Sequence, residues 1–261
     1  MLTTQLWIEF KRAITIKNIL IWLSIITLIP LVSFYPIREG YMFFKSVEVF
    51  QEMVGRIIPL IFPVLVIIIY LPNFLQEQKN NFITYTRPRV PLSIYILSKG
   101  IINAFLTGFI ILLMMFFSFT FAVFIEPYYL NIIEYSPIVR GNHYSSVTFS
   151  QLLKYGDLTY GIVYSLWVAI NAVIYSTIAF LLMLIIRLPF VALSAPFLFY
   201  HIFNFVVGVF GIARFSPIST IFPFNIEQQP LWTVLVPFTF LLIVLCILYF
   251  IVTRNKEGWM I

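Results

Sequence analysis

The chain has 261 residues, of which 61% are hydrophobic, 19% aromatic and only 10% charged. An average soluble domain is about 45–50% apolar and about 25% charged. This composition, with a mean hydropathy of +1.00, therefore excludes a disordered chain, a nucleic-acid-binding domain and an ordinary cytosolic enzyme. We expect an all-α polytopic membrane protein whose main solvent is lipid.

Residues 1–18 are predicted to form an amphipathic helix that lies on the membrane surface. Their apolar side chains recur at helical spacing: Leu2, Leu6, Trp7, Phe10 and Ile14. Their charged side chains fall largely on the other side: Glu9, Lys11, Arg12 and Lys17. This pattern is typical of an interfacial helix. The alternative is a long cytoplasmic end of the first span.

Six membrane spans are predicted, because a spanning helix needs about 20 mostly apolar residues. None of the six windows contains Asp, Glu, Lys or Arg, and they cover residues 19–37, 57–75, 100–125, 161–186, 190–212 and 232–252. The outer connection 38–56 is predicted to hold a short surface helix, and 126–160 a small extracellular subdomain. The link Arg187-Leu188-Pro189 is so short that the spans on either side must be antiparallel neighbours.

The charges between the spans indicate the orientation. With both termini inside, the inner connections hold ten basic and three acidic residues, a net charge of +7, and the outer connections have a net charge of −1. Cytoplasmic loops carry the excess of Lys and Arg, so both termini are predicted to be cytoplasmic. The +6 net charge of the whole chain thus reports orientation, not a nucleic-acid partner.

The cytoplasmic connection 76–99 is the most informative stretch. Its 24 residues, QEQKNNFITYTRPRVPLSIYILSK, are too apolar for a flexible linker. Prolines at 88 and 91 predict short surface helices with breaks near them.

This connection resembles the one between the second and third spans of ABC-2 type permeases. In that family a Glu, often followed by Gly, opens a short coupling helix, a basic Pro-containing turn follows, and a Lys opens the third span. The residues in these roles here are Glu77, Asn80, Asn81, Phe82, Ile83, Arg87, Pro88, Arg89 and Lys99. Asn replaces the usual Gly, and Asn also tolerates left-handed backbone. Chain length, span number and the short link between spans 4 and 5 fit the same family.

The resemblance implies a permease subunit, in a bacterial plasma membrane, that pairs with a second copy or a homologous permease and docks on separate ABC ATPase subunits. ATP and Mg would be bound by those ATPases, and this chain would bind no cofactor. The segment that would couple to the ATPase contains Glu77, Lys79, Asn80, Asn81, Phe82, Ile83, Thr84, Tyr85, Arg87, Pro88 and Arg89.

A polar and small-residue stripe lies in the fifth predicted span. Phe197, His201, Asn204 and Gly208 follow one another at spacings of four, three and four. Such a stripe favours close helix packing at an interface, and the alternative is a surface of the translocation path between two permeases.

Motifs of other functional classes are missing from the sequence. It has no G-x-x-x-x-G-K-[ST] loop for ATP, no H-E-x-x-H and no G-x-S-x-G, and its single cysteine, Cys246, excludes a disulfide framework. The absence of charge in the spans favours an amphipathic or hydrophobic cargo, such as an antimicrobial or toxin peptide; a drug, lipid or glycan is the alternative. A membrane enzyme acting on lipids and a non-transporting immunity protein are rivals of other classes.

Overall fold

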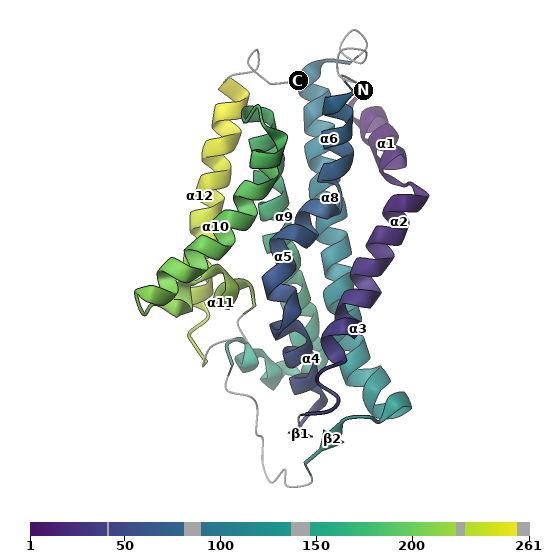
Figure 1. Ribbon diagram of the computed structural model, residues 1–261, viewed down its shortest axis with the longest axis vertical. Coiled ribbons are helices and arrows are strands. Elements are labelled where there is room, and N and C mark those ends of the chain that lie inside the picture. Colours follow the sequence, from purple (N-terminus) through teal and green to yellow (C-terminus); the bar gives the residue numbers. More distant parts are fainter. Residues whose placement is uncertain (41, 81–89, 137–146, 223–227, 255–261) are drawn as a thin grey trace.

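The protein is an elongated bundle of helices that run side by side along its long axis (Figure 1). The computed structural model describes residues 1–40, 42–80, 90–136, 147–222 and 228–254. Within these ranges, five helical segments are long and apolar enough to cross a membrane, and a bent pair of helices makes a sixth if it is counted as one span. The expected all-α membrane protein is confirmed, but only five of the described spans are continuous helices.

The N-terminal part is two helices separated by a short break. Helix α1 (Leu2–Ala13) ends before Thr15, whose hydroxyl accepts a hydrogen bond from the Asn18 N–H at 3.2 Å and so caps the next helix. The first span then runs through α2 (Ile16–Leu23), the π-helical turn η1 (Ser24–Leu28) and α3 (Ile29–Phe34). The predicted boundary at residue 18 was therefore a few residues late.

The second predicted span, 57–75, is not one helix. Helices α4 (Ser46–Gly55) and α5 (Ile57–Ile68) meet at a bend of 58°, and a further break at Tyr70 precedes α6 (Leu71–Lys79). The Trp22 indole N–H donates to the carbonyl of Ile69 at 3.0 Å, so a side chain from the first span satisfies a backbone group at the break.

Helix α4 differs from the predicted surface helix in its environment. Its side chains Val49, Phe50 and Met53 are fully buried, and the Gln51 amide donates to the Tyr160 hydroxyl at 3.0 Å. This short helix is apolar on two sides, and neighbouring helices cover both sides. Its burial therefore exceeds that of a surface helix, which has one solvated face. Helix α4 is thus part of the bundle and not a helix on its surface.

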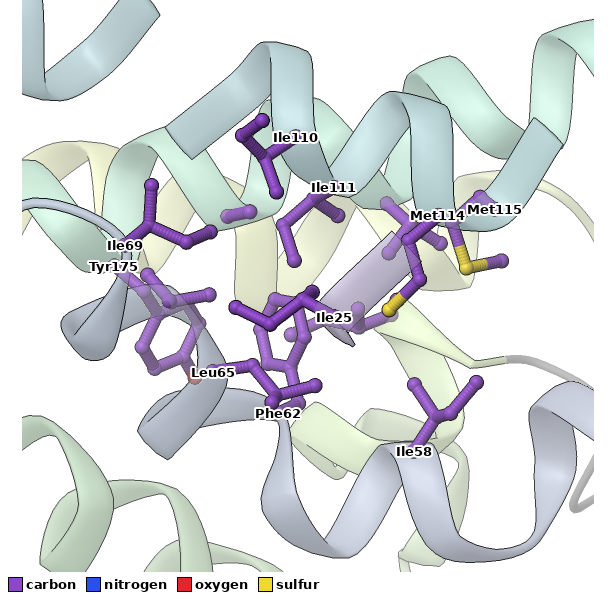
Figure 2. Close-up of a cluster of buried hydrophobic side chains, with 14 of the residues drawn as sticks. Ile25, Ile58, Phe62, Leu65, Ile69, Ile110, Ile111, Met114, Met115 and Tyr175 are labelled. Carbon is purple, nitrogen blue, oxygen red and sulfur yellow. The ribbon is translucent and has the colours of Figure 1, made fainter. Parts of the chain in front are cut away.

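Helices α8 (Leu92–Thr120) and α9 (Asp157–Ile185) form the centre of the bundle. The most apolar stretch of α9 is 72% buried, against 17% for α12. Gly161 permits the close approach of α9 to α8, since a Cβ atom there would lie 2.6 Å from the Phe119 ring. Figure 2 shows Ile25 of η1 in the core between Phe62 and Leu65 of α5 and Ile111 and Met114 of α8.

The connections at the end of the bundle opposite α1 are ordered by a buried carboxylate (Figure 1). Helix α8 continues into the π-helix η2 (Phe121–Leu130), so Glu126 belongs to a helix and not to a loop. Glu126 is fully buried and accepts hydrogen bonds from the Ile133 N–H at 2.7 Å and the Tyr135 hydroxyl at 2.7 Å. Strand β2 (Glu134–Tyr135) pairs in parallel with β1 (Met42–Phe43), and the 3-10 helix η3 (Ser150–Tyr155) precedes α9.

The C-terminal helices flank this centre. Helix α10 (Pro189–Val209) begins four residues after the end of α9 and packs against it, which confirms the predicted antiparallel neighbours and the proline in the first turn. The short helices η4 (Ala213–Phe215) and α11 (Pro217–Ile221) lead to α12 (Trp232–Arg254). The last turn of α12 lies at the same end of the bundle as α1 (Figure 1).

Candidate functional site

The candidate site lies where α6 and α8 flank the predicted coupling segment. Helix α6 extends to Lys79 and α8 begins at Leu92, so both ends of the predicted connection 76–99 are helical and residues 80–91 link the two helices. Lys79 and Asn80 are exposed at the end of α6. The other predicted coupling residues, Asn81, Phe82, Ile83, Thr84, Tyr85, Arg87, Pro88 and Arg89, lie outside the described residues.

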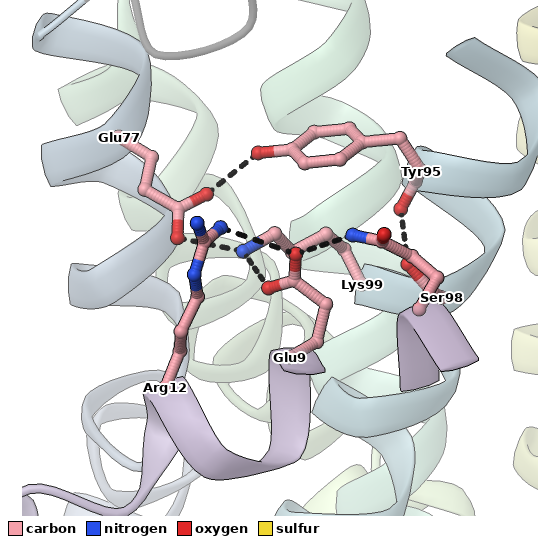
Figure 3. Close-up of polar contacts among 7 residues, drawn as sticks. Glu9, Arg12, Glu77, Tyr95, Ser98 and Lys99 are labelled. Carbon is pink, nitrogen blue, oxygen red and sulfur yellow. Dashed lines mark hydrogen bonds and ion pairs between the residues drawn. The ribbon is translucent and has the colours of Figure 1, made fainter. Parts of the chain in front are cut away.

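Glu77 joins the two flanking helices directly (Figure 3). One oxygen of its carboxylate pairs with the Lys99 ammonium at 2.6 Å, and the other accepts from the Tyr95 hydroxyl at 2.6 Å. The Lys99 ammonium also lies 5.3 Å from the centre of the Tyr95 ring. Because Glu77 belongs to α6 and both partners belong to α8, these contacts close the base of the 80–91 connection.

The same ammonium pairs with Glu9 of α1 (Figure 3). The Glu9 side chain is fully shielded and that of Lys99 is 2% exposed. Glu9 also accepts from the Gln5 amide at 2.8 Å and lies 3.5 Å from the Arg12 guanidinium. Lys99 thus holds one carboxylate from α1 and one from α6, and we call Glu9, Glu77, Tyr95 and Lys99 the polar joint.

Charge balance makes this burial tolerable. An isolated buried ion is strongly destabilised, and breaking a buried pair is costly because it leaves one charge without compensation. Two carboxylates, Glu9 and Glu77, here meet two cations, Lys99 and the partly exposed Arg12. The joint therefore keeps three helices in contact at one end of the bundle.

The position of Glu9 is a correction to the amphipathic interpretation of α1. The residues of α1 that face the bundle are Gln5, Glu9 and Ala13, whereas Trp7 is 57% exposed. The predicted apolar face of α1 is therefore only partly in contact with the protein: Leu6 and Phe10 pack at its edge, where the Phe10 and Phe105 rings have their centres 6.3 Å apart, while an acid that meets Lys99 lies between α1 and α8. A Gln-Glu-Ala stripe at intervals of four was the sequence signal for this face.

Lys99 is not the first residue of its helix. It was expected to open the third span, but α8 starts at Leu92, so Lys99 is about two turns inside the helix. A charged residue inside a membrane helix is rare and faces a partner within the protein. Of its two acidic partners, Glu77 had been included in the predicted coupling segment. Glu9 had not been predicted as a site residue.

Helix α6 has a second anchor, on α9. The Gln78 amide donates to the carbonyl of Met183 at 3.3 Å, and the rings of Phe74 and Phe180 have their centres 5.0 Å apart. The start of the coupling segment is therefore fixed to the most buried helix of the bundle as well as to α8.

The stripe predicted in the fifth span lies along α10. The Phe197 and His201 rings have their centres 4.4 Å apart, and Phe197 lines an apolar cleft with Val64 and Ile67 of α5. The Asn204 side-chain oxygen accepts from the Ile218 N–H at 2.9 Å and so holds the start of α11. At Gly208 a Cβ atom would meet no atom within 4 Å, so the close packing expected there does not occur within this chain.

Neither a search for metal ligands nor comparison with known proteins assigns a function to this chain. In the described part of the chain, no three His, Cys, Asp or Glu residues come together as a metal site. Comparison with protein families, curated proteins and solved structures finds no match to this chain.

Proposed function

We propose that this chain is the permease subunit of an ABC-2 type exporter that is driven by separate ATPase subunits. The observation that carries the proposal is the polar joint, because it fixes both helices that flank the 80–91 connection to each other and to α1. A push on this connection would be passed to the ends of α6, α8 and α1 and not absorbed by a flexible linker.

The face that would meet the ATPase is basic. The sequence around the connection places Lys79, Arg87 and Arg89 within eleven residues, and α1 and the end of α12 lie at the same end of the bundle (Figure 1). The excess of basic residues at this end supports a cytoplasmic orientation. An acidic groove on a partner ATPase would be complementary to it.

The cargo that we propose is amphipathic or hydrophobic, with an antimicrobial or toxin peptide as the first candidate. The supporting observation is the apolar character of the helices α10 and α12, which expose large side chains such as Phe190, Phe205 and Phe250. A second permease, identical or homologous, would cover part of this surface, and the cargo would pass between the two.

The test is co-purification with an ATPase encoded beside this chain, followed by ATPase assays in nanodiscs with peptides, lipids and drugs. We expect Phe82→Asp and Arg87→Glu to weaken co-purification about tenfold, which corresponds to about 1.4 kcal/mol. Arg214→Glu, an exposed position in η4, is the matched control and should bind normally. Undiminished docking and transport in both loop variants would overturn the proposal.

A further inference from the structure

A polar stripe on α8 continues from the polar joint toward the middle of the bundle. Asn103 and Thr107 follow Lys99 at intervals of four residues, so the three side chains lie on one face of the helix. Asn103 and Thr107 are both 0% exposed. Among the residues that the structure describes, the two polar atoms of the Asn103 amide and the Thr107 hydroxyl have no hydrogen-bond partner. Buried polar groups are nearly always satisfied, so these atoms call for a ligand.

Other buried polar residues of the central helices bond to their own helix. The Ser118 hydroxyl donates to a carbonyl one turn earlier in α8 at 2.8 Å, and the Asn171 amide does the same in α9 at 2.9 Å. Such bonds satisfy a polar side chain in an apolar helix without any other partner. Asn103 and Thr107 make no bond of this kind within the described chain. Their polar atoms are therefore directed into the space between α8 and its neighbours.

Helix α6 places a second asparagine at the depth of Asn103. Helices α6 and α8 run in opposite directions, and Glu77 of α6 meets Lys99 of α8. One turn from this pair toward the middle of the bundle are Asn73 on α6 and Asn103 on α8. Asn73 lies on the same face of α6 as Glu77, because the two are four residues apart.

The first span brings a third asparagine to this depth. Trp22 donates to the carbonyl of Ile69 at the break between α5 and α6. Asn18 precedes Trp22 by one turn and Asn73 follows Ile69 by one turn, both toward the α1 end (Figure 1). Helix α1 and the turn η1, which flank α2, both pack against α8, and Asn18 is only 7% exposed. We call the four residues the polar seam: Asn18, Asn73, Asn103 and Thr107.

The polar seam has the chemistry of a water site. An amide side chain and a hydroxyl group each offer both a donor and an acceptor, so a matching ligand must also do both. A cation is disfavoured by the Lys99 ammonium one turn from Asn103, and an anion by the Glu77 carboxylate one turn from Asn73. Water is the usual partner of buried polar groups that the protein leaves unsatisfied, and it also serves breaks in membrane helices.

The α1 end offers water a way in. The Glu77 side chain is 21% exposed and Asn73 is half-buried, whereas Asn103 is fully buried. We propose that the polar seam binds a short chain of water molecules, which extends from the polar joint toward the break between α5 and α6 and bonds to Asn103 and Thr107. Bridging water can exchange partners, so it would let α6 shift against α8. That consequence rests on the proposed function, and the water site itself does not.

The experiment is water-edited solid-state NMR of the intact chain in lipid bilayers, with labelled asparagine side chains. It follows magnetisation that passes from water protons to each side-chain amide. Asn171 is the matched control, because it is 1% exposed and its amide bonds within α9. We expect the Asn103 amide to receive water magnetisation several-fold faster than the Asn171 amide, with the two signals assigned by their loss in Asn103→Leu and Asn171→Leu. Equal rates for the two amides would overturn the proposal.

Melting temperatures give a second readout. Thr107→Val keeps the shape of the side chain and removes the hydroxyl. If water bonds to this hydroxyl, the variant should melt at a lower temperature than the parent, and transfer to the Asn103 amide should slow. An unchanged or higher melting temperature would overturn the proposal, because it would mean that the hydroxyl is buried in a dry site. Thr177→Val, which removes a hydroxyl that bonds within α9, is the control and should leave the Asn103 rate unchanged. No ATPase is present, so a negative result would not bear on the proposed transport function.

Discussion

Glu9 of α1 and Lys99 of α8 form an ion pair that is almost completely shielded, with side chains that are 0% and 2% exposed. Ninety positions of sequence separate them, yet the pair decides where the N-terminal helix lies. Glu77 binds the same ammonium, so the helix that precedes the 80–91 connection shares this contact.

Replacing the central cation should destabilise the protein strongly. In Lys99→Met the carboxylates of Glu9 and Glu77 would remain in the protein without their common partner. We expect a loss of about 3–5 kcal/mol, the usual effect of breaking a buried ion pair, measured by denaturant unfolding in detergent micelles. Lys79→Met, at an exposed position, is the control and should unfold like the parent.

A double variant tests whether the loss comes from uncompensated charge. Glu9→Gln combined with Lys99→Met removes one carboxylate and the cation together, so the two effects should not add. If the double variant is as unstable as the sum of the single variants, Glu9 and Lys99 are not coupled.

Trp22→Phe should loosen the break between α5 and α6. The indole N–H that satisfies the Ile69 carbonyl would be lost, while the aromatic ring would be largely retained. Leaving a buried acceptor without a partner costs about 1–3 kcal/mol, which thermal unfolding would report. Trp232→Phe changes an indole that is 56% exposed and should be neutral; equal melting temperatures for both variants would contradict the assigned role.

Gly161→Ala tests the closeness of α8 and α9. The added methyl group would lie 2.6 Å from the Phe119 ring, and overpacking of this kind costs about 1–3 kcal/mol. Gly208→Ala has open space around the new methyl group and should be neutral or more stable by up to about 1 kcal/mol. The melting temperatures of the two variants are compared with that of the parent. An unchanged melting temperature for Gly161→Ala would show that α8 and α9 can move apart easily.

Gly208 also provides the cleaner test of the predicted pairing surface. Asn204→Ala would disturb α11, because Asn204 accepts from the Ile218 N–H. Gly208→Trp leaves this contact intact and adds a large side chain to an exposed position. If α10 pairs with a second permease copy, we expect weaker self-association in cross-linking and light scattering, with an unchanged melting temperature. Normal self-association would place the interface elsewhere.

The end of the bundle that holds β1 and β2 should lose stability at alkaline pH through Tyr135. Burial, together with the hydrogen bond to Glu126, raises the pKa of the Tyr135 phenol. A raised folded-state pKa means that the stabilisation is complete below the unfolded value of about 10 and declines as the pH rises above it. Tyr135→Phe should be less stable than the parent at pH 8, with the difference shrinking at higher pH. Tyr129→Phe, 84% exposed, is the control, and a constant difference across this range would contradict the assignment.

Much of the architecture follows from the composition and order of the residues. Long apolar runs without charge can only be helices in a membrane, because lipid offers no partner for backbone N–H and C=O groups. The runs around Leu106, Val173 and Leu241 therefore became α8, α9 and α12 as expected. The three residues between α9 and α10 likewise determined that these helices are antiparallel neighbours.

Helix breaks and pairings across the bundle did not follow from local pattern. The apolar run of the second span reads as one helix, yet it is broken at Tyr70, where Trp22 from another span satisfies the backbone. Helix α4 reads as a surface helix, yet Phe50 is packed against Phe119 and Tyr164. In both cases the deciding partners are distant in sequence.

The few charged residues also show which features follow from the sequence and which depend on the tertiary structure. The sequence by itself determined that they lie outside the apolar runs, because a charge in lipid is strongly unfavourable. Only the tertiary structure decided that Glu9 turns inward while Trp7 faces out, since the energy of a buried carboxylate depends on whether Lys99 and Arg12 reach it. That condition is set by the packing of α1 on α8, because Lys99 belongs to α8 and lies far outside residues 1–18.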